Sequence, residues 1–305
     1  MHNKIKKLSD QLSKVILGKD KQINLALTCL FADGHLLIED IPGIGKTTLA
    51  KSIAKSLSMD FSRVQCTNDM LPGDIIGFSI FDQEKNSFNF HRGPVFTQIL
   101  LADEINRATP KTQSALLEAM EEKQVSIDSN TFKLEEPFFV IATQNPLEQS
   151  GTYPLPESQL DRFLMKVSLG YPERDFEIEL LKKGGALNLA SDIQSIMTSS
   201  EVIEIQNKTK EVHISDSLFK YIQNILEFSR DSGLFQTGLS PRAGINLSKA
   251  ARAYAYIQER DHVLPEDIQE ILPYIACHRL RFKESGQELK TKQLDKIFKE
   301  VNLPH

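Results

Sequence analysis

The chain has 305 residues, enough for about two domains at roughly 150 residues each. Its 36 Lys and Arg against 41 Asp and Glu give a formal net charge of −5, and 40% hydrophobic with 25% charged residues is typical of a globular protein rather than a disordered or fibrous one. The acidic balance argues against a surface built mainly to bind nucleic acid.

Cysteine and histidine usage bounds the chemistry further. Cys29, Cys66 and Cys277 lie far apart and form neither a CxxC pair nor a disulfide framework, so we expect a reducing, cytoplasmic setting. The seven histidines lack the spacing of a zinc site. The N-terminal segment lacks the apolar stretch of a signal peptide, and no apolar run approaches the ~18 residues of a membrane helix, so we expect no membrane insertion.

The first 175 residues alternate short apolar runs with helical periodicity. This pattern predicts an α/β domain with a parallel sheet and helices on both faces. Predicted strands lie at 35–39, 61–66, 99–103, 138–143 and 165–169. One predicted helix covers 47–57, and another begins at Thr109-Pro110 as N-cap and first-turn proline. Segments 78–91 and 124–134 are predicted to be hairpins inserted into this core.

The rest of the chain is predicted to be helical. We place a nucleotide-binding core at 1–175, a connecting segment at 176–214 and a smaller all-α lid domain at 215–305. Helices are expected to begin at Ser240-Pro241 and at Pro265. A last helix carries apolar residues at i, i+3, i+4 and i+7: Leu294, Ile297, Phe298 and Val301.

The sharpest local motif is residues 40–48, DIPGIGKTT, between a predicted strand and helix. Glycines let successive backbone N–H groups point inward at a phosphate, and the helix start complements its charge. Lys46 would reach the β- and γ-phosphates, and the Thr47 hydroxyl would bind Mg²⁺. Asp40 stands where the strict pattern has glycine, so its carboxylate must point away from the phosphates. The alternative is a plain strand–helix turn with an incidental lysine.

Acidic residues follow the third predicted strand. Asp103-Glu104 ends the apolar run 99–102, where a carboxylate beside a phosphate loop is placed to hold Mg²⁺ through water. Glu104 would polarise the attacking water. Acidic residues after strands are common in solvated loops, so this pair alone is a weak signal, but together with the upstream loop it predicts a site for ATP hydrolysis.

A polar amide follows the next strand, in Gln144-Asn145-Pro146. Asn145 could orient water and sense the γ-phosphate. Its alternative role is that of a capping or turn residue before proline.

The order of these motifs resembles that of AAA+ ATPases of the MoxR family, over roughly residues 15–283. The motifs are IIGF, LLADEINRA, IATQNP, YPLPESQLDRFLM and LSPRA. Asp40 fits the resemblance, because loops of this family read E-D-x-P-G-x-G-K-T. The two hairpins resemble the helix-2 insert and the pre-sensor insert of the same clade. The resemblance implies a five-stranded core, a helical lid, a ring that is usually hexameric, and ATP with Mg²⁺ as ligands.

The resemblance also implies roles for single residues. It makes Lys46, Thr47 and Thr48, with Pro42, Gly43, Ile44 and Gly45, the Walker A loop, and Asp103-Glu104 Walker B. Asn145 is similar to sensor 1, Arg162 to the arginine finger and Arg242 to sensor 2. Val15, Ile16 and Gly18 resemble the segment that contacts adenine.

Several arginines have a structural alternative beside the functional one. Arg242 follows the expected N-cap Ser240, where a helix start favours anions, but an arginine there is often simply solvated. Arg162 could form a local salt bridge with Asp161. Arg107 and Arg174 are further candidates, and each could equally be a surface residue. His278, in a family-like HRL segment, is interpreted as a packing or hydrogen-bonding residue.

The favoured function is a ring-forming ATPase that remodels partner proteins. The resemblance implies chaperone-like maturation or metal-cofactor insertion, commonly with separate von Willebrand factor A domain proteins. One alternative is a DNA-remodelling or translocating protein, but the hairpin tips 81–90 and 126–133 carry as many acids as lysines or more. Another is a nucleotide-sensing scaffold without hydrolysis, against which the Asp103-Glu104 pair argues.

Overall fold

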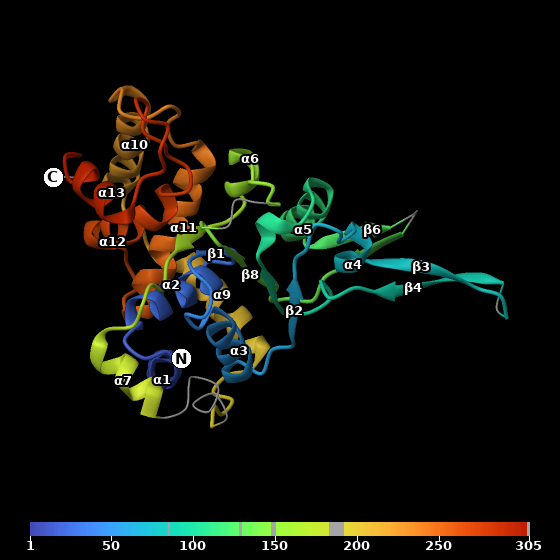
Figure 1. Ribbon diagram of the computed structural model, residues 1–305. Coiled ribbons are helices and arrows are strands. Elements are labelled where there is room, and N and C mark those ends of the chain that lie inside the picture. Colours follow the sequence, from blue (N-terminus) through green and yellow to red (C-terminus); the bar gives the residue numbers. More distant parts are fainter. Residues whose placement is uncertain (85, 128–129, 148–150, 183–191, 304–305) are drawn as a thin grey trace.

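Five parallel strands form the central sheet of the computed structural model, which describes residues 1–84, 86–127, 130–147, 151–182 and 192–303. The strand order is β2-β5-β8-β1-β9. The strands are β1 (Leu36–Glu39), β2 (Phe61–Gln65), β5 (Ile99–Asp103), β8 (Phe139–Gln144) and β9 (Met165–Val167). The predicted parallel sheet is confirmed (Figure 1).

Helices cover both faces of the sheet, as the apolar strands require. Leu36 and Ile38 of β1 face one hydrophobic cluster, and Leu37 between them faces a second. The first cluster is completed by α1 (His2–Val15), α2 (Asp20–Phe31) and α3 (Lys46–Ser56). The second is completed by α4 (Pro72–Ile76), the short 3₁₀ helix η1 (Ile105–Arg107) and α5 (Pro110–Glu122), whose N-cap Thr109 accepts a hydrogen bond from the Thr112 N–H.

Two antiparallel hairpins stand outside the main sheet. They consist of β3 (Gly77–Asp82) with β4 (Ser87–Arg92), and of β6 (Gln124–Ile127) with β7 (Asn130–Lys133). The first hairpin extends far from the body of the molecule (Figure 1). The rings of Phe90 and Phe132 stack with centroids 4.4 Å apart and so join the two hairpins. Lys85 and Asp128-Ser129, which the sequence analysis included in the hairpin segments, lie outside the described residues.

The C-terminal part is the predicted helical lid. It contains α10 (Asp216–Asp231), α11 (Pro241–Ile257), α12 (Pro265–Ala276) and α13 (Thr291–Phe298). The Ser240 hydroxyl accepts a hydrogen bond from the Ala243 N–H at 3.1 Å and so caps α11.

The range 176–214, expected as a connection, carries helical structure of its own. It holds most of α7 (Arg174–Lys182) and all of α9 (Ser199–Glu211), while residues 183–191 lie outside the described residues. α9 packs against α2 of the core and α11 of the lid, with Val202 and Ile205 fully buried. This segment therefore contributes to the packing between the two parts.

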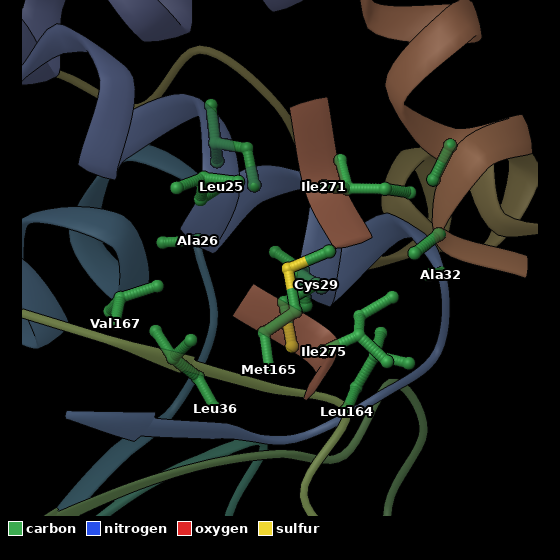
Figure 2. Packing of buried hydrophobic residues seen from close by; sticks show 14 of the residues in the cluster. Leu25, Ala26, Cys29, Ala32, Leu36, Leu164, Met165, Val167, Ile271 and Ile275 are labelled. Carbon is green, nitrogen blue, oxygen red and sulfur yellow. The ribbon is translucent and has the colours of Figure 1, made fainter. Parts of the chain in front are cut away.

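Helix α2 lies between the sheet and the lid. Figure 2 shows Cys29 of this helix among Leu36 and Met165 of the strands and Ile271 and Ile275 of α12. Such burial raises the pKa of the Cys29 thiol, which therefore stays neutral. Core and lid consequently share one hydrophobic cluster. None of the helices in the described part of the chain is both long and apolar enough to cross a membrane.

Candidate active site

The strand order gathers three predicted segments at the carboxyl edge of the sheet. β1 runs into the loop that precedes α3, β5 ends at Asp103 and β8 ends just before Asn145. β8 lies between β5 and β1, and the Asp40 N–H donates to the Gln144 carbonyl at 3.0 Å. This is the edge at which ligands bind in open parallel sheets.

The loop before α3 has the backbone of a phosphate-binding turn. Gly43 and Gly45 have φ angles of +85° and +94°, which residues with a side chain rarely adopt. Gly45 is the N-cap of α3, so the positive end of this helix lies at the loop. Thr47 and Thr48 follow in its first turn, and Pro42 and Ile44 complete the loop.

Lys46, the first residue of α3, is buried at this edge. Its Nζ donates to the backbone carbonyl of Asp40 at 2.6 Å. Burial lowers the pKa of Lys46, while the carboxylates of Asp103, Asp40 and Glu104 act in the opposite direction. The ammonium group is thus within electrostatic reach of the acidic pair that ends β5.

The carboxylate of Asp40 is occupied on the side of β9. Its Oδ2 accepts hydrogen bonds from the Ser168 hydroxyl at 2.9 Å and from the Gly170 N–H at 2.7 Å. Its Oδ1 accepts from the Ile41 N–H at 3.1 Å. The acid that replaces glycine in the loop pattern therefore fastens the turn after β9 through Oδ2, while its Oδ1 is engaged within the loop by Ile41.

Asp103 and Glu104 are joined through Thr143 of β8. The Thr143 hydroxyl donates to Asp103 Oδ1 at 2.6 Å and accepts from the Glu104 N–H at 2.9 Å. Arg63 of β2 donates to Asp103 Oδ2 from Nη2 at 2.7 Å and from Nε at 3.2 Å. Glu104 has a φ of +55°, so the chain turns sharply after the strand.

The carboxylate of Glu104 accepts hydrogen bonds from two other side chains. Its Oε2 accepts from Gln65 Nε2 at 2.9 Å and from Arg107 Nη1 at 3.0 Å. This places Arg107 beside the acidic pair. Arg63, Gln65 and Thr143 were not predicted from the sequence, although a signal exists: each is a polar residue within a strand of the sheet, and Gln65 and Thr143 lie at or next to the carboxyl end.

Asn145 is buried beside this edge and makes a local contact. Its Oδ1 accepts from the Leu147 N–H at 3.1 Å, which is the turn geometry of its alternative reading.

The segment compared with an adenine pocket is only partly exposed. Val15 and Ile16 are buried in the larger hydrophobic cluster. Gly18 has a φ of +68°, and the ring of Phe176 lies so close that a side-chain carbon at Gly18 would overlap it. Lys19 Nζ donates to the Tyr171 carbonyl at 2.7 Å. Gly18 therefore lies against α7 (Arg174–Lys182), a few residues beyond the turn that Asp40 fastens.

Arg162 and Arg242 meet elsewhere, on one carboxylate of α5. Arg162 Nε lies 3.1 Å from Glu121 Oε2, and Arg242 Nη1 lies 2.9 Å from Glu121 Oε1. These side chains line a cavity of about 260 Å³ together with Gly34 and His35, which precede β1.

Their position changes the interpretation of Arg242. We expected it among the ATP-binding residues, but within one chain it lies at the amino end of β1, whereas Lys46 follows the carboxyl end. The four residues of β1 separate the two ends by about 13 Å. The physical reason is the docking of the lid through α2, which sets the start of α11 beside the end of α5 rather than beside the phosphate loop.

The remaining candidates have other partners. Asp161 pairs with Arg279 of the lid, Oδ1 to Nε 2.6 Å, and not with Arg162. Arg279, which sequence reasoning missed, also donates to the Phe163 carbonyl at 2.8 Å. His278 is buried with Nε2 3.1 Å from the same carbonyl, and burial lowers its pKa well below the usual value. Arg174 is exposed at the start of α7.

A phosphate-binding turn after β1, an acidic pair at the end of β5 and a helical lid together define an AAA-type ATPase. Residues 35–165 match the family model described as "ATPase family associated with various cellular activities (AAA)", and residues 227–300 match the AAA lid domain. A crystal structure of a candidate ATPase from Cytophaga hutchinsonii superposes with a TM-score of 0.91 and 41% identity, covering 100% of this chain and 96% of that one.

Curated relatives narrow the assignment. The chain is 44% identical to the uncharacterized protein YeaC of Bacillus subtilis, over 92% of this chain and 88% of that protein. It is 38% identical to Chaperone MoxR1 of Mycobacterium tuberculosis, over 88% of this chain and 74% of that protein. The chain belongs to the MoxR family of AAA+ ATPases.

Proposed function

We propose that this protein hydrolyses ATP with Mg²⁺ in an oligomeric ring and uses the energy to remodel partner proteins. One observation carries the proposal: Lys46 is buried at the edge where Asp103 and Glu104 end, and their carboxylates act on its pKa. A lysine that can bind phosphates, an aspartate that can bind Mg²⁺ and a glutamate that can activate water thus lie at the same edge of the sheet. The similarity to a protein named Chaperone MoxR1 supports the chaperone-like part.

Each residue at this edge has a distinct task. Lys46 leaves the Asp40 carbonyl to pair with phosphate oxygens, which the N–H groups of the loop also bind. The Thr47 hydroxyl and the Asp103 carboxylate are the hard oxygen donors that Mg²⁺ prefers, so this donor set fits the ion. Bound Mg²⁺ supplies neutralisation of phosphate charge. Glu104, released from Gln65 and Arg107, accepts a proton from the attacking water, which the Asn145 amide helps to orient.

Two variants separate binding from hydrolysis. Lys46→Ala should abolish tight ATP binding, because it removes the cation that the loop presents to the phosphates. Glu104→Gln should bind ATP normally and release little phosphate, because only water activation is lost. Equal weakening of ATP affinity in both variants would contradict this division of roles.

Arg162 and Arg242 act across a subunit boundary in this proposal. Within the chain they lie at the other end of β1 from Lys46, so they cannot serve the same nucleotide without a large rearrangement. In a ring, which we propose is hexameric, they would complete the site of a neighbouring subunit. An arginine supplied in this way stabilises the charge that develops on the transferred phosphoryl group and raises the rate by roughly 10³–10⁵.

A mixing experiment tests the ring. Lys46→Ala subunits keep their arginines but have an inactive loop, and Arg162→Ala subunits keep the loop but lack the finger. We expect each variant alone to be inactive and the mixture to recover ATPase activity. No recovery, with mixed rings demonstrated by native mass spectrometry, would contradict an arginine acting in trans.

The client surface is proposed to include hairpin β3–β4. Phe78, Ile80, Phe81 and Phe88 are 51%, 46%, 47% and 71% exposed on this projecting element. Such apolar exposure on a soluble chain is typical of a surface that binds a partner. We propose a separate client, such as a von Willebrand factor A domain protein, as the family resemblance implies. A protein captured by Glu104→Gln in ATP and lost with the added substitution Phe88→Ser would identify it.

A further inference from the structure

The carboxylate of Glu121 joins an arginine of the core to an arginine of the lid. Glu121 lies in the last turn of α5, Arg162 precedes β9 in the core, and Arg242 opens α11 of the lid. Each arginine uses a different oxygen, at 3.1 Å and 2.9 Å. We propose that Glu121 is a positioning residue that holds Arg162 and Arg242 together as one cationic pair for the ATP of a neighbouring subunit. The inference rests on the proposed trans role of Arg162.

Electrostatics gives the reason that such a pair needs a carboxylate. Two guanidinium groups side by side repel each other, and a carboxylate between them converts the repulsion into two attractions. The side chains of Arg162, Glu121 and Arg242 are 29%, 35% and 44% exposed. They are therefore screened less than free surface charges, yet a phosphate from outside can still reach the two arginines.

Two other acids near these arginines, Asp33 and Asp161, already form ion pairs with different residues. Asp33 and Glu121 are the acids among the described residues that line this cavity. Asp33 is paired with Lys123, Oδ2 to Nζ 2.6 Å. Asp161, next to Arg162 in the chain, is paired with Arg279. Glu118 and Glu122 line a second cavity with Arg162, but among the described residues Glu121 is the acid that forms ion pairs with both Arg162 and Arg242.

Helix α5 connects this pair to the active site of its own subunit. It begins just after η1, whose Arg107 contacts Glu104, and ends at Glu122. Its 13 residues span about 20 Å. A rigid helix thus runs from the acid proposed to activate water in one subunit to the arginines presented to the next. In this proposal, the position of Arg162 and Arg242 therefore depends on the state of the Glu104 site in the same subunit.

The test uses Glu121→Gln, with Glu300→Gln as the matched control on an exposed residue of the lid. We expect Glu121→Gln to bind ATP within twofold of the parent, to keep its thermal midpoint and to lose at least tenfold in kcat. Glu121→Asp, which keeps the charge on a shorter side chain, should be intermediate. Glu300→Gln should match the parent in each measurement.

Mixing distinguishes positioning in trans from a local structural effect. Lys46→Ala subunits retain an intact Glu121 and both arginines, so they should restore ATPase activity to Glu121→Gln subunits in mixed rings. A defect confined to the Glu121→Gln subunit's own site would not be rescued in this way, and such a result would overturn the proposal.

Two further outcomes separate this inference from the proposed function. A parental or raised kcat in Glu121→Gln, with Arg162→Ala inactive, would overturn the positioning role and leave the trans finger intact. Parental activity in Arg162→Ala would remove the trans finger itself, and the inference with it. If Glu121→Gln lowered the thermal midpoint, Glu121→Asp would decide: a kcat clearly above that of Glu121→Gln would support the proposal, and a kcat as low as that of Glu121→Gln and not raised by Lys46→Ala subunits would overturn it.

Discussion

Arg63 and Asp103 form an ion pair across two adjacent strands, with Arg63 Nη2 and Nε 2.7 Å and 3.2 Å from the same carboxylate oxygen. The other oxygen of Asp103 accepts from Thr143. Both oxygens of the proposed Mg²⁺-binding acid are therefore engaged, one of them by a cation. In the proposed site, Arg63 and Mg²⁺ compete electrostatically for Asp103.

Removal of the Arg63 side chain should raise the apparent affinity of the site for Mg²⁺. Arg63→Ala is expected to lower the Mg²⁺ concentration for half-maximal ATPase activity by about three- to tenfold, which corresponds to about 0.7–1.4 kcal/mol. Magnesium titration of the steady-state rate at saturating ATP measures it. Arg63→Lys, which keeps the positive charge, is the control and should stay near the parent. An unchanged magnesium dependence in Arg63→Ala would show that the pair does not compete with the ion.

Asp40 provides a second prediction, because its carboxylate accepts from Ser168 and Gly170. Asp40→Gly creates the strict loop pattern, yet it should change ATP affinity by less than tenfold, about 1.4 kcal/mol. It should instead lower the free energy of unfolding by about 1.5–3 kcal/mol, because hydrogen bonds to a charged acceptor are lost. Calorimetry with ATP and denaturant unfolding measure the two effects. A large gain in ATP affinity would mean that the carboxylate acts on the nucleotide.

Local patterns were sufficient to predict much of this fold. Apolar runs gave the five strands, and Thr109 and Ser240 were predicted as caps because a cap depends on neighbouring residues only. The motif spacing also indicated which loops would meet, since the carboxyl ends of parallel strands share one edge.

Contacts between strands distant in sequence could not be predicted in the same way. Arg63 meets Asp103 only because β2 pairs with β5 after a helix and a hairpin intervene, and nothing local specifies that pairing. The sequence required Asp40 to point away from phosphate but could not name Ser168 as its partner. The contact of Arg242 with Glu121 could not be predicted for a similar reason, since the surroundings of Arg242 depend on how the lid docks through α2.

A buried histidine predicts acid sensitivity. The Nδ1 of His35 accepts from the Val140 N–H at 3.0 Å, so its Nε2 carries the proton that faces the Met120 carbonyl at 3.1 Å. Burial lowers the pKa of His35 from 6.5 to about 4. Because the unfolded chain binds this proton more readily, stability is full above pH 6.5 and is lost as the pH falls toward 4. The contribution of this residue is about 3 kcal/mol.

Denaturant unfolding between pH 7.5 and 4.5 measures the effect. His35→Gln should be less stable at pH 7.5 but lose less stability on acidification than the parent. His278, whose pKa burial also lowers, contributes a slope of the same sign in both proteins. Identical pH slopes for parent and variant would assign the acid sensitivity to other groups.

Lys166 gives the last prediction, because it joins the sheet to the lid through two acids. Its Nζ lies 3.0 Å from Glu39 Oε2 at the end of β1 and 2.7 Å from Glu288 Oε2 of the lid. The acids Glu39 and Glu288 raise the pKa of Lys166 despite its burial, so the lysine is charged at neutral pH. Lys166→Met should lower the free energy of unfolding by about 3 kcal/mol, because Glu39 is left without its cation beside Glu288, which keeps only Arg281 at 3.5 Å.

The matched variants identify the source of that loss. Glu288 is more exposed than Lys166, so Glu288→Gln should cost about 1 kcal/mol or less. In the triple variant Lys166→Met, Glu39→Gln, Glu288→Gln, the unpaired charges are gone, and most of the stability should return. Equilibrium unfolding of the three proteins measures these differences. If the triple variant were as unstable as Lys166→Met alone, the cost would come from lost packing at the junction of β9 and the lid rather than from uncompensated charge.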